Sequence, residues 1–319
     1  MLPTLEAIEA AARLIAAEVP PTPQFRWPQL CDRLGAEIWL KHEDCTAAGA
    51  FKIRGGLVYF DALSRTAQPP QGVITATRGN HGQSIGFAAR RYGIAATIVV
   101  PHGNSREKNA AMRALGVTLI EHGDDFQAAR EYAEEQAERQ GLHMIPSLHP
   151  LLVAGVATYS LEFLRAVPDL DVVYVPIGLG SSICGMIAAR NALGLKTKIV
   201  GVVSAHAAAY ARSFQERKPL SQAVSTQLAD GMAVRTPDPA ALDILLAHAD
   251  HIVEVTDAEI GAAMRMIFEC THHVAEGAGA SSLAAATQER ERIAGRRVGT
   301  VLSGANVDRD VFARVLSAS

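Results

Sequence analysis

The sequence predicts a two-lobed α/β fold, with mostly parallel twisted sheets flanked by helices. Short runs rich in β-branched residues alternate with alanine-rich stretches of helical length, and strands that are apolar throughout are typical of sheets buried on both faces. The alternation occurs in two series along the chain, which predicts two sheets. With 319 residues, 49% of them hydrophobic, the chain is long enough to bury two such cores.

The two series define two expected domains. In the first, strands are expected at residues 72–77, 96–101 and 117–123, and helices at residues 81–93, 105–116 and 124–141. In the second, strands are expected at residues 170–178, 198–205 and 299–304, with a helix at residues 182–194. We therefore expect residues 69–149 to form a small domain, and residues 1–68 with 150–319 to form a large one. A ligand is expected in the cleft between them, at the carboxyl ends of the strands.

Composition and charge exclude several classes of partner. Thirty Lys and Arg residues against thirty-three Asp and Glu give a net charge of −3, without a basic run that would track nucleic acid. Apolar runs stop well short of the ~20 residues that span a membrane, and no signal peptide is evident, so a cytoplasmic protein is expected. The four cysteines form no CxxC pair, which predicts neither a disulfide framework nor a zinc site.

A glycine-rich turn follows the strand at residues 170–178. The segment "VVYVPIGLGSSICGMIAAR" passes through Gly178, Gly180, Ser181 and Ser182 into a helix, where backbone N–H groups and two hydroxyls would bind an anion. An ordinary tight turn is the alternative. A dinucleotide is disfavoured because the next strand ends in Ser204 rather than in an acid, so a small phosphate-bearing ligand fits better.

Two other strand ends carry similar signals. "TATRGNHGQS" places Gly79 and Asn80 between a strand and a helix, although a plain helix cap beside a decorative His81 is the alternative. "VLSGANVD" delivers Ser303 to a turn, which alone is a common strand ending. Upstream, "GAFKIRGG" contains Lys52, either a surface charge or an amine held for chemistry.

Metal and hydrolase signals are weak. His248, His251 and the pair His272 and His273 occur without an HExxH pattern or a suitably spaced acid, so surface or capping histidines are expected and no metal is predicted. No GxSxG occurs, so a hydrolase nucleophile elbow is not supported.

Taken in order, "GAFKIRGG", "TRGNHGQS", "VPIGLGSSICG", "AEGAGA" and "VLSGANVD" resemble the motifs of the serine/threonine dehydratase and serine racemase family of pyridoxal-phosphate enzymes. The resemblance covers nearly the whole chain. It implies the tryptophan synthase beta-like fold (fold type II), with a cofactor-binding large domain, a mobile small domain and a homodimer. The cofactor implied is pyridoxal 5′-phosphate.

The resemblance also implies roles for individual residues. Lys52 would form the Schiff base, Phe51 would pack near the ring, and Ser303 would bond the pyridine nitrogen. The remaining cofactor residues implied are Asn80, Gly178, Leu179, Gly180, Ser181, Ser182 and Glu276. The substrate residues implied are Thr77, Arg78, Gly79, Asn80, His81 and His149.

The chemistry of these residue types agrees with the roles. An exposed lysine has a pKa of about 10.4, and burial lowers it enough for the amine to act as nucleophile and base. A neutral serine at the pyridine nitrogen does not hold that nitrogen protonated, which favours expulsion of a β-leaving group. We therefore expect a dehydratase and ammonia-lyase that acts on an L-β-hydroxy-α-amino acid, with threonine or serine as the default substrate.

This sequence departs from the family at several positions. Ala50 replaces a serine, and Leu179 and Ser181 interrupt a run of glycines. Arg78 stands where racemases of the family have a proton-delivering serine, and arginine cannot act as that base. Ser204 and Tyr210 replace the acids of the relatives' divalent-cation site, which again predicts no metal.

Alternatives remain open at this stage. Arg78 would bind a second carboxylate, as in 3-hydroxyaspartate, stack on the ring of phenylserine, or pair with a protein acid. Ser147, Leu148 and His149 replace an acidic pair of the relatives, which points to a different pocket selectivity. An amino-acid racemase or β-replacement synthase is the alternative enzyme, and a non-catalytic protein that binds pyridoxal phosphate or a small anion is the alternative of another class. No C-terminal regulatory domain is expected.

Overall fold

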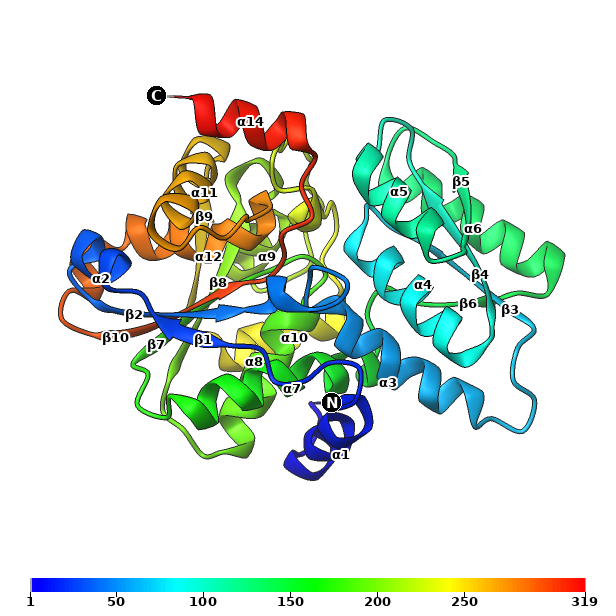
Figure 1. Cartoon of the computed structure of the whole chain (residues 1–319), viewed down its shortest axis with the longest axis horizontal. Coiled ribbons are helices and arrows are strands. Elements are labelled where there is room, and N and C mark those ends of the chain that lie inside the picture. The colour runs from blue at the N-terminus through cyan, green and yellow to red at the C-terminus, as the bar shows by residue number, and fades with distance from the viewer. Residues whose placement is uncertain (1, 319) are drawn as a thin grey trace.

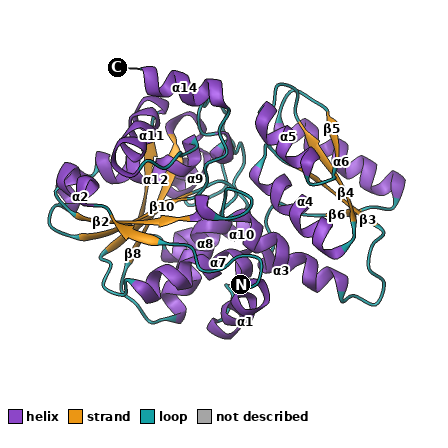
Figure 2. Cartoon of the chain, viewed as in Figure 1, coloured by secondary structure: helices purple, strands orange, loops and turns teal. Residues whose placement is uncertain are grey.

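The computed structural model describes residues 2–318 and contains two β-sheets, each with helices packed against it. Figure 1 shows the sheets in two lobes that lie side by side, and Figure 2 shows helices covering both of them. The fold class expected from the sequence is confirmed. Among the described helices, none is both long and apolar enough to cross a bilayer.

The larger sheet has six strands in the order β1-β2-β10-β7-β8-β9. All neighbours are parallel except β1 and β2, which pair antiparallel. The strands are β1 (Gln24–Arg26), β2 (Glu37–His42), β7 (Val172–Pro176), β8 (Lys198–Ser204), β9 (His251–Val255) and β10 (Arg297–Leu302). The order places the ends of β7 and β10 next to each other in the centre of the sheet.

The smaller sheet has four parallel strands in the order β5-β4-β3-β6. They are β3 (Gly72–Ala76), β4 (Ala95–Val100), β5 (Thr118–Glu121) and β6 (His143–Met144). All four lie within the expected small domain. One of the two cores of this lobe also contains residues of α1 (Leu5–Ile15) and α3 (Lys52–Ser64), which lie outside residues 69–149. The division at those residues therefore stays a proposal.

Side-chain alternation explains why both faces of the larger sheet are covered. Along β7, Val173 packs into one core and Val172 and Tyr174 into the other, as the two-residue period of a strand requires. The first core is formed with α7 (Pro150–Ala166), α8 (Ser181–Ala192), α9 (Ala209–Glu216) and α10 (Pro239–His248). The second is formed with α2 (Pro28–Leu34), α11 (Asp257–Thr271), α12 (Gly277–Gln288) and α14 (Arg309–Ser317).

On one face of the smaller sheet, α4 (Asn80–Tyr92) and α5 (Arg106–Ala114) pack in the core that also contains residues of α1 and α3. On the other face lies α6 (Phe126–Gln140). The remaining elements are α13 (Arg290–Ile293) and the 3₁₀ turns η1 (Glu43–Cys45), η2 (Ala205–Ala207) and η3 (Asp230–Met232).

Helices α3 and α7 approach so closely that only glycine fits between them. A Cβ atom on Gly155 would lie 2.4 Å from the carbonyl oxygen of Arg54 and 2.7 Å from the Cα atom of Gly55. Since real Cβ atoms do not approach so closely, a side chain at Gly155 would force the two helices apart. The first turn of α3, which begins at Lys52, is thus fixed against α7.

A buried ionic network joins β2, η1, α3 and α7. The Arg54 guanidinium donates to Glu43 at 2.7 and 3.0 Å and to Glu162 at 2.7 and 3.0 Å, and it is fully buried. Lys41 donates to Glu162 at 2.8 Å. Burial alone would lower the pKa of Arg54, but the charges of Glu43 and Glu162 outweigh it and hold that pKa above its usual value. Every charge in the network therefore depends on the others for compensation.

Replacing Arg54 by Leu is expected to lower the free energy of unfolding by about 3–5 kcal/mol, because Glu43 loses its buried cation. The matched control is Arg130→Leu, which breaks an exposed pair with Glu134 and is expected to cost less than ~0.5 kcal/mol. Urea unfolding followed by circular dichroism measures both changes. Equal midpoints for the two variants would show that the network contributes no more than a surface pair.

Candidate active site

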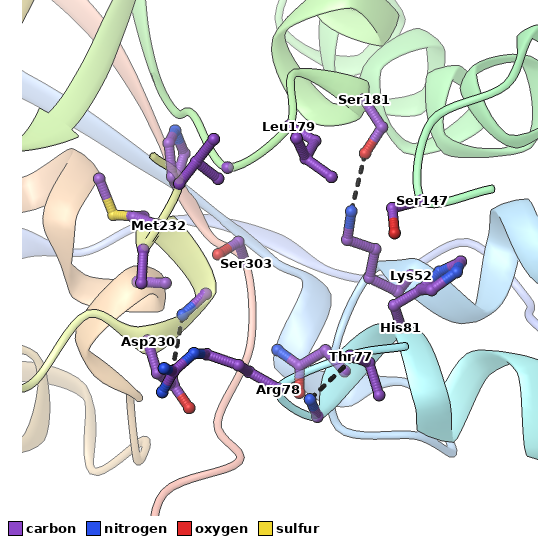
Figure 3. A pocket seen from close by; sticks show the side chains of 18 of the residues that line it. Lys52, Thr77, Arg78, His81, Ser147, Leu179, Ser181, Asp230, Met232 and Ser303 are labelled. Atoms are coloured by element: carbon purple, nitrogen blue, oxygen red, sulfur yellow. Dashed lines mark hydrogen bonds between the residues drawn. The ribbon is translucent and has the colours of Figure 1, made fainter. Parts of the chain in front are cut away.

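The described residues form a pocket between the two lobes, where the carboxyl ends of β3, β7 and β10 meet. Figure 3 shows Lys52 and Arg78 reaching into it from different elements, with Ser303 in the same pocket. Fourteen sequence-predicted residues line it: Phe51, Lys52, Thr77, Arg78, Gly79, Asn80, His81, Gly178, Leu179, Gly180, Ser181, Ser182, Glu276 and Ser303. Their roles remain proposals, but the fold brings them together.

Lys52 is the first residue of α3 and its amine lies inside the protein. Its Nζ donates to the Ser181 hydroxyl at 2.9 Å and lies 4.9 Å from the centre of the Phe51 ring. The Ser84 hydroxyl donates to the Lys52 carbonyl at 2.6 Å, which ties the start of α3 to α4. Burial disfavours the charged amine and lowers its pKa to about 8. Near neutral pH most of Lys52 is still charged, but its uncharged fraction is much larger than that of an exposed lysine.

The turn between β7 and α8 has the geometry of an anion-binding site. Gly180 has a φ of 105°, and a Cβ atom there would lie 2.7 Å from the Cβ of Ala241. A Cβ on Gly178 would lie 2.6 Å from the carbonyl oxygen of Gly231. The turn opens α8 at Ser181, so N–H groups at a helix N-terminus face the pocket, with the buried hydroxyls of Ser181 and Ser182 beside them.

The loop between β3 and α4 has a backbone that glycine permits. Gly79 has a φ of 154°, and its N–H donates to the Thr77 hydroxyl at 2.9 Å. Asn80 donates from its side chain to Glu276 and accepts from Asn306 at 2.9 Å. These contacts fix the orientation of the Asn80 amide and leave the N–H groups at the start of α4 as donors towards the pocket.

His81 is buried beside Lys52 and uncharged. Burial, together with the charge of Lys52, lowers the pKa of His81 to about 3. Its Nε2 has no hydrogen-bond partner among the described residues. A histidine with so low a pKa is a weak proton acceptor at neutral pH.

Arg78 projects into the same pocket without an acidic partner. The residue is half-buried, its Nε has no hydrogen-bond partner among the described residues, and none of the ion pairs they form includes it. The pairing with a protein acid that the sequence left open is thus not observed. An unpaired, half-buried guanidinium is poised to bind an anionic or aromatic group of a ligand.

A buried ion cluster in the pocket was missed by the sequence analysis. Lys108 of α5 lies 2.8 Å from Asp230 and 2.9 Å from Glu276, so a cation of one lobe meets two carboxylates of the other. Burial alone would lower the pKa of Lys108, but the two carboxylates outweigh it and raise that pKa above its usual value. The sequence predicted only a helix at residues 105–116, and the partners of Lys108 lie more than 120 residues away in the chain.

His149 lies outside the pocket, unlike the other residues assigned to it. Its Nδ1 accepts from the Leu151 N–H at 3.2 Å as the N-cap of α7, and its ring packs on Tyr59 at 5.1 Å. The neighbouring Ser147 lines the pocket instead. The position of His149 thus suits a capping role rather than substrate binding.

Comparisons with known proteins agree on one family. The sequence pattern of the family described as "Pyridoxal-phosphate dependent enzyme" matches residues 15–304. The L-threonine ammonia-lyase of Thermotoga maritima is 33% identical over 315 residues, which cover 98% of this chain and 78% of that protein. The biosynthetic L-threonine dehydratase of Haemophilus influenzae is 33% identical over 92% of this chain, which spans only 57% of that enzyme. The solved structure of maize serine racemase has a TM-score of 0.90 and 27% identity, covering 98% of this chain and 97% of that chain.

The reactivity of Lys52 is expected to rise with pH, to reach half of its maximum near pH 8 and to level off at higher pH, since only the uncharged amine is a nucleophile. Competitive acetylation of the ligand-free protein at a series of pH values, followed by mass spectrometry of the peptide that contains Lys52, gives this profile. Nα-acetyl-lysine in the same tube supplies the reference, with a midpoint of about 10.4. A Lys52 profile that follows the reference would show that burial does not lower this pKa.

Proposed function

Because the chain belongs to the family of pyridoxal-phosphate dependent enzymes, we propose that it removes water from an L-β-hydroxy-α-amino acid and releases a 2-oxo acid and ammonia. Its cofactor is pyridoxal 5′-phosphate, and it is a pyridoxal-phosphate-dependent lyase. The substrate and the residue roles are parts of the proposal. The observation that supports elimination best is that the buried Lys52 amine has a pKa lowered to about 8, so that it can take up and return a proton near neutral pH.

The residues of the pocket fit the cofactor. Lys52 supplies the amine that would hold its aldehyde carbon, and the turn at residues 178–182 offers N–H groups and hydroxyls for its phosphate. The turn requires glycine at positions 178 and 180 because a Cβ atom at either would clash with Gly231 or Ala241. Ser303 ends the strand beside this turn and would meet the ring nitrogen with a hydroxyl that is neutral at all working pH values. When bound, the cofactor accepts the electrons that the substrate releases as its α-proton leaves.

Lys52 would move the α-proton, since its pKa of about 8 allows the amine to accept a proton and give it back near neutral pH. The other titratable residues that line the pocket are poor candidates. The pKa of His81 is about 3, and Asp230 and Glu276 are both paired with Lys108. Arg78 stays protonated and cannot accept a proton. A site with one base favours elimination over racemisation, which needs a second base on the other face of the substrate.

The substrate carboxylate would bind at the loop of residues 77–81. N–H groups at the start of α4 combine donors with the positive end of the helix dipole, which favours an anion. Asn80, whose amide orientation is fixed by Glu276 and Asn306, would contact the cofactor from the same loop. Together these contacts would place the α-carbon of the substrate near Lys52.

Threonine and serine are the default substrates, and Arg78 adds a preference. Its guanidinium lacks a protein acid, and a second carboxylate would compensate the charge more strongly than an aromatic ring would. We therefore place 3-hydroxyaspartate ahead of phenylserine as the substrate that Arg78 would favour.

A 2-oxo acid assay with serine, threonine, 3-hydroxyaspartate and phenylserine tests both the proposed reaction and the proposed substrate preference. For the Arg78→Ala variant, kcat/KM on 3-hydroxyaspartate is expected to fall by about 10–100-fold, the equivalent of losing a hydrogen bond to a charged group. The values on serine and threonine should change much less.

Arg78→Lys retains the charge and is the matched control, and Lys52→Ala supplies the background rate, where turnover should be absent. If kcat/KM on all four substrates falls by one factor, Arg78 contacts a group common to them rather than a second carboxylate. Undiminished turnover by Lys52→Ala, or D-enantiomer as the main product in chiral chromatography, would contradict the proposed reaction.

A further inference from the structure

A cluster of metal-binding residue types lies outside the pocket. His42 ends β2, Asp44 and Cys45 belong to η1, and His273 follows α11, with one potential ligand atom from each within 4.8 Å of the others. Ligand spacing in the sequence gave no sign of this cluster, because Asp44 and His273 are 229 residues apart and only the fold brings them together.

Three donors converge on the Asp44 carboxylate. The ring Nδ1 of His273 lies 2.7 Å from Oδ2 of Asp44, and the ring Nδ1 of His42 lies 3.2 Å from Oδ1. The Cys45 thiol lies 3.8 Å from Oδ2. One negative charge therefore attracts two N–H groups and one S–H group, each of which a cation can replace.

Trp27 decides which histidine is free to bind a cation. Its indole N–H donates to Nε2 of His42 at 3.1 Å, so this nitrogen must keep its lone pair and the proton of the neutral ring must lie on Nδ1. That proton points to Asp44. His42 is also fully buried. It thus orients the carboxylate, as a residue behind a metal ligand does, and is not itself available as a ligand.

His273 and Cys45 are under no such constraint. No hydrogen bond to Nε2 of His273 is found among the described residues, and 29% of this side chain is exposed, so its proton can move from Nδ1 to the water-facing Nε2. Cys45 is exposed, and the one hydrogen bond found for its thiol within residues 2–318 goes to the Asp44 carboxylate. Both side chains can present a lone pair to the same point beside Oδ2 of Asp44.

We propose that Oδ2 of Asp44, Sγ of Cys45 and Nδ1 of His273 bind one zinc ion, with water in the fourth position and with Trp27 and His42 holding Asp44 from behind. On binding, the metal–sulfur bond forms and the thiol proton leaves to solvent. One carboxylate, one thiolate and one imidazole form a set that suits this borderline-soft cation better than magnesium or calcium. Metal–ligand bonds of about 2.0–2.3 Å require the distance between Oδ2 of Asp44 and Nδ1 of His273 to increase from 2.7 Å by roughly half an ångström.

The location suggests what the ion would do. Cys45 lies seven residues before Lys52, and His273 lies three residues before Glu276. The ion would therefore clamp together the segments that lead to the amine and to the carboxylate of the pocket. This role does not depend on which substrate the enzyme uses.

The direct test is a titration of tag-free holoenzyme with Co²⁺ as a spectroscopic substitute for zinc, read as a difference spectrum. We expect one equivalent of Co²⁺ to bind and to give a sulfur-to-cobalt charge-transfer band. The Cys45→Ser variant should lose this band and bind Co²⁺ at least a hundredfold more weakly. Cys31→Ser, which changes another free cysteine, should leave both unchanged. Trp27→Phe removes the hydrogen bond to His42 but keeps an aromatic ring beside His42 and His273, so it should keep the band while weakening binding by about tenfold.

Three outcomes would overturn the proposal. They are the absence of stoichiometric Co²⁺ or Zn²⁺ after gel filtration, an unchanged band in Cys45→Ser, and a loss of the band in Trp27→Phe as complete as in Cys45→Ser. Circular dichroism of each variant confirms that it is folded. The Asp44→Asn variant provides a second test, since it keeps the side-chain volume but should bind at least a hundredfold more weakly.

Discussion

The position of Lys52 depends on the buried charge network two residues further along α3. Arg54 joins the carboxylates of Glu43 and Glu162, which come from η1 and α7, so the first turn of α3 is fixed to both. The close approach of α3 to α7 at Gly155 excludes any shift of that turn towards α7. A buried amine that must meet one carbon atom is useful only if its position is fixed, and this network supplies the rigidity.

Besides the apolar core that α1 and α3 share with the smaller sheet, charged and polar groups join the two lobes. Lys108 of α5 reaches two carboxylates of the large lobe in the pocket. Further out, Asp308 accepts from the N–H groups of Arg106 and Glu107 at the start of α5, while Glu107 accepts from the N–H of Arg309 at the start of α14. Each helix thus caps the other across the lobe boundary. The capping contacts are exposed to water, whereas the Lys108 cluster is buried.

The sequence predicts well what local chemistry determines. Apolar strands of the two series were identified because burial on both faces requires uniform apolarity, as in β7 and β8. The glycine turns at residues 79 and 178–180 were found because a positive φ or a close contact admits little else. Strand β2 was missed because it contains the polar residues Lys41 and His42. Both are fully buried, and their hydrogen-bond partners include Glu162 and Trp27, which are distant in sequence. Lys108 and Asp44 were missed for the same reason, since their partners are far away in sequence.

The central claim is that Lys52, among all lysines of the chain, is the amine that takes up the cofactor. Reducing the protein with borohydride in the presence of pyridoxal phosphate, followed by peptide mapping with mass spectrometry, tests it most directly. We expect one added pyridoxyl phosphate group per chain, located on Lys52, and none on the charge-paired Lys41 or Lys108. A label on either of those lysines, or no stoichiometric label, would contradict it.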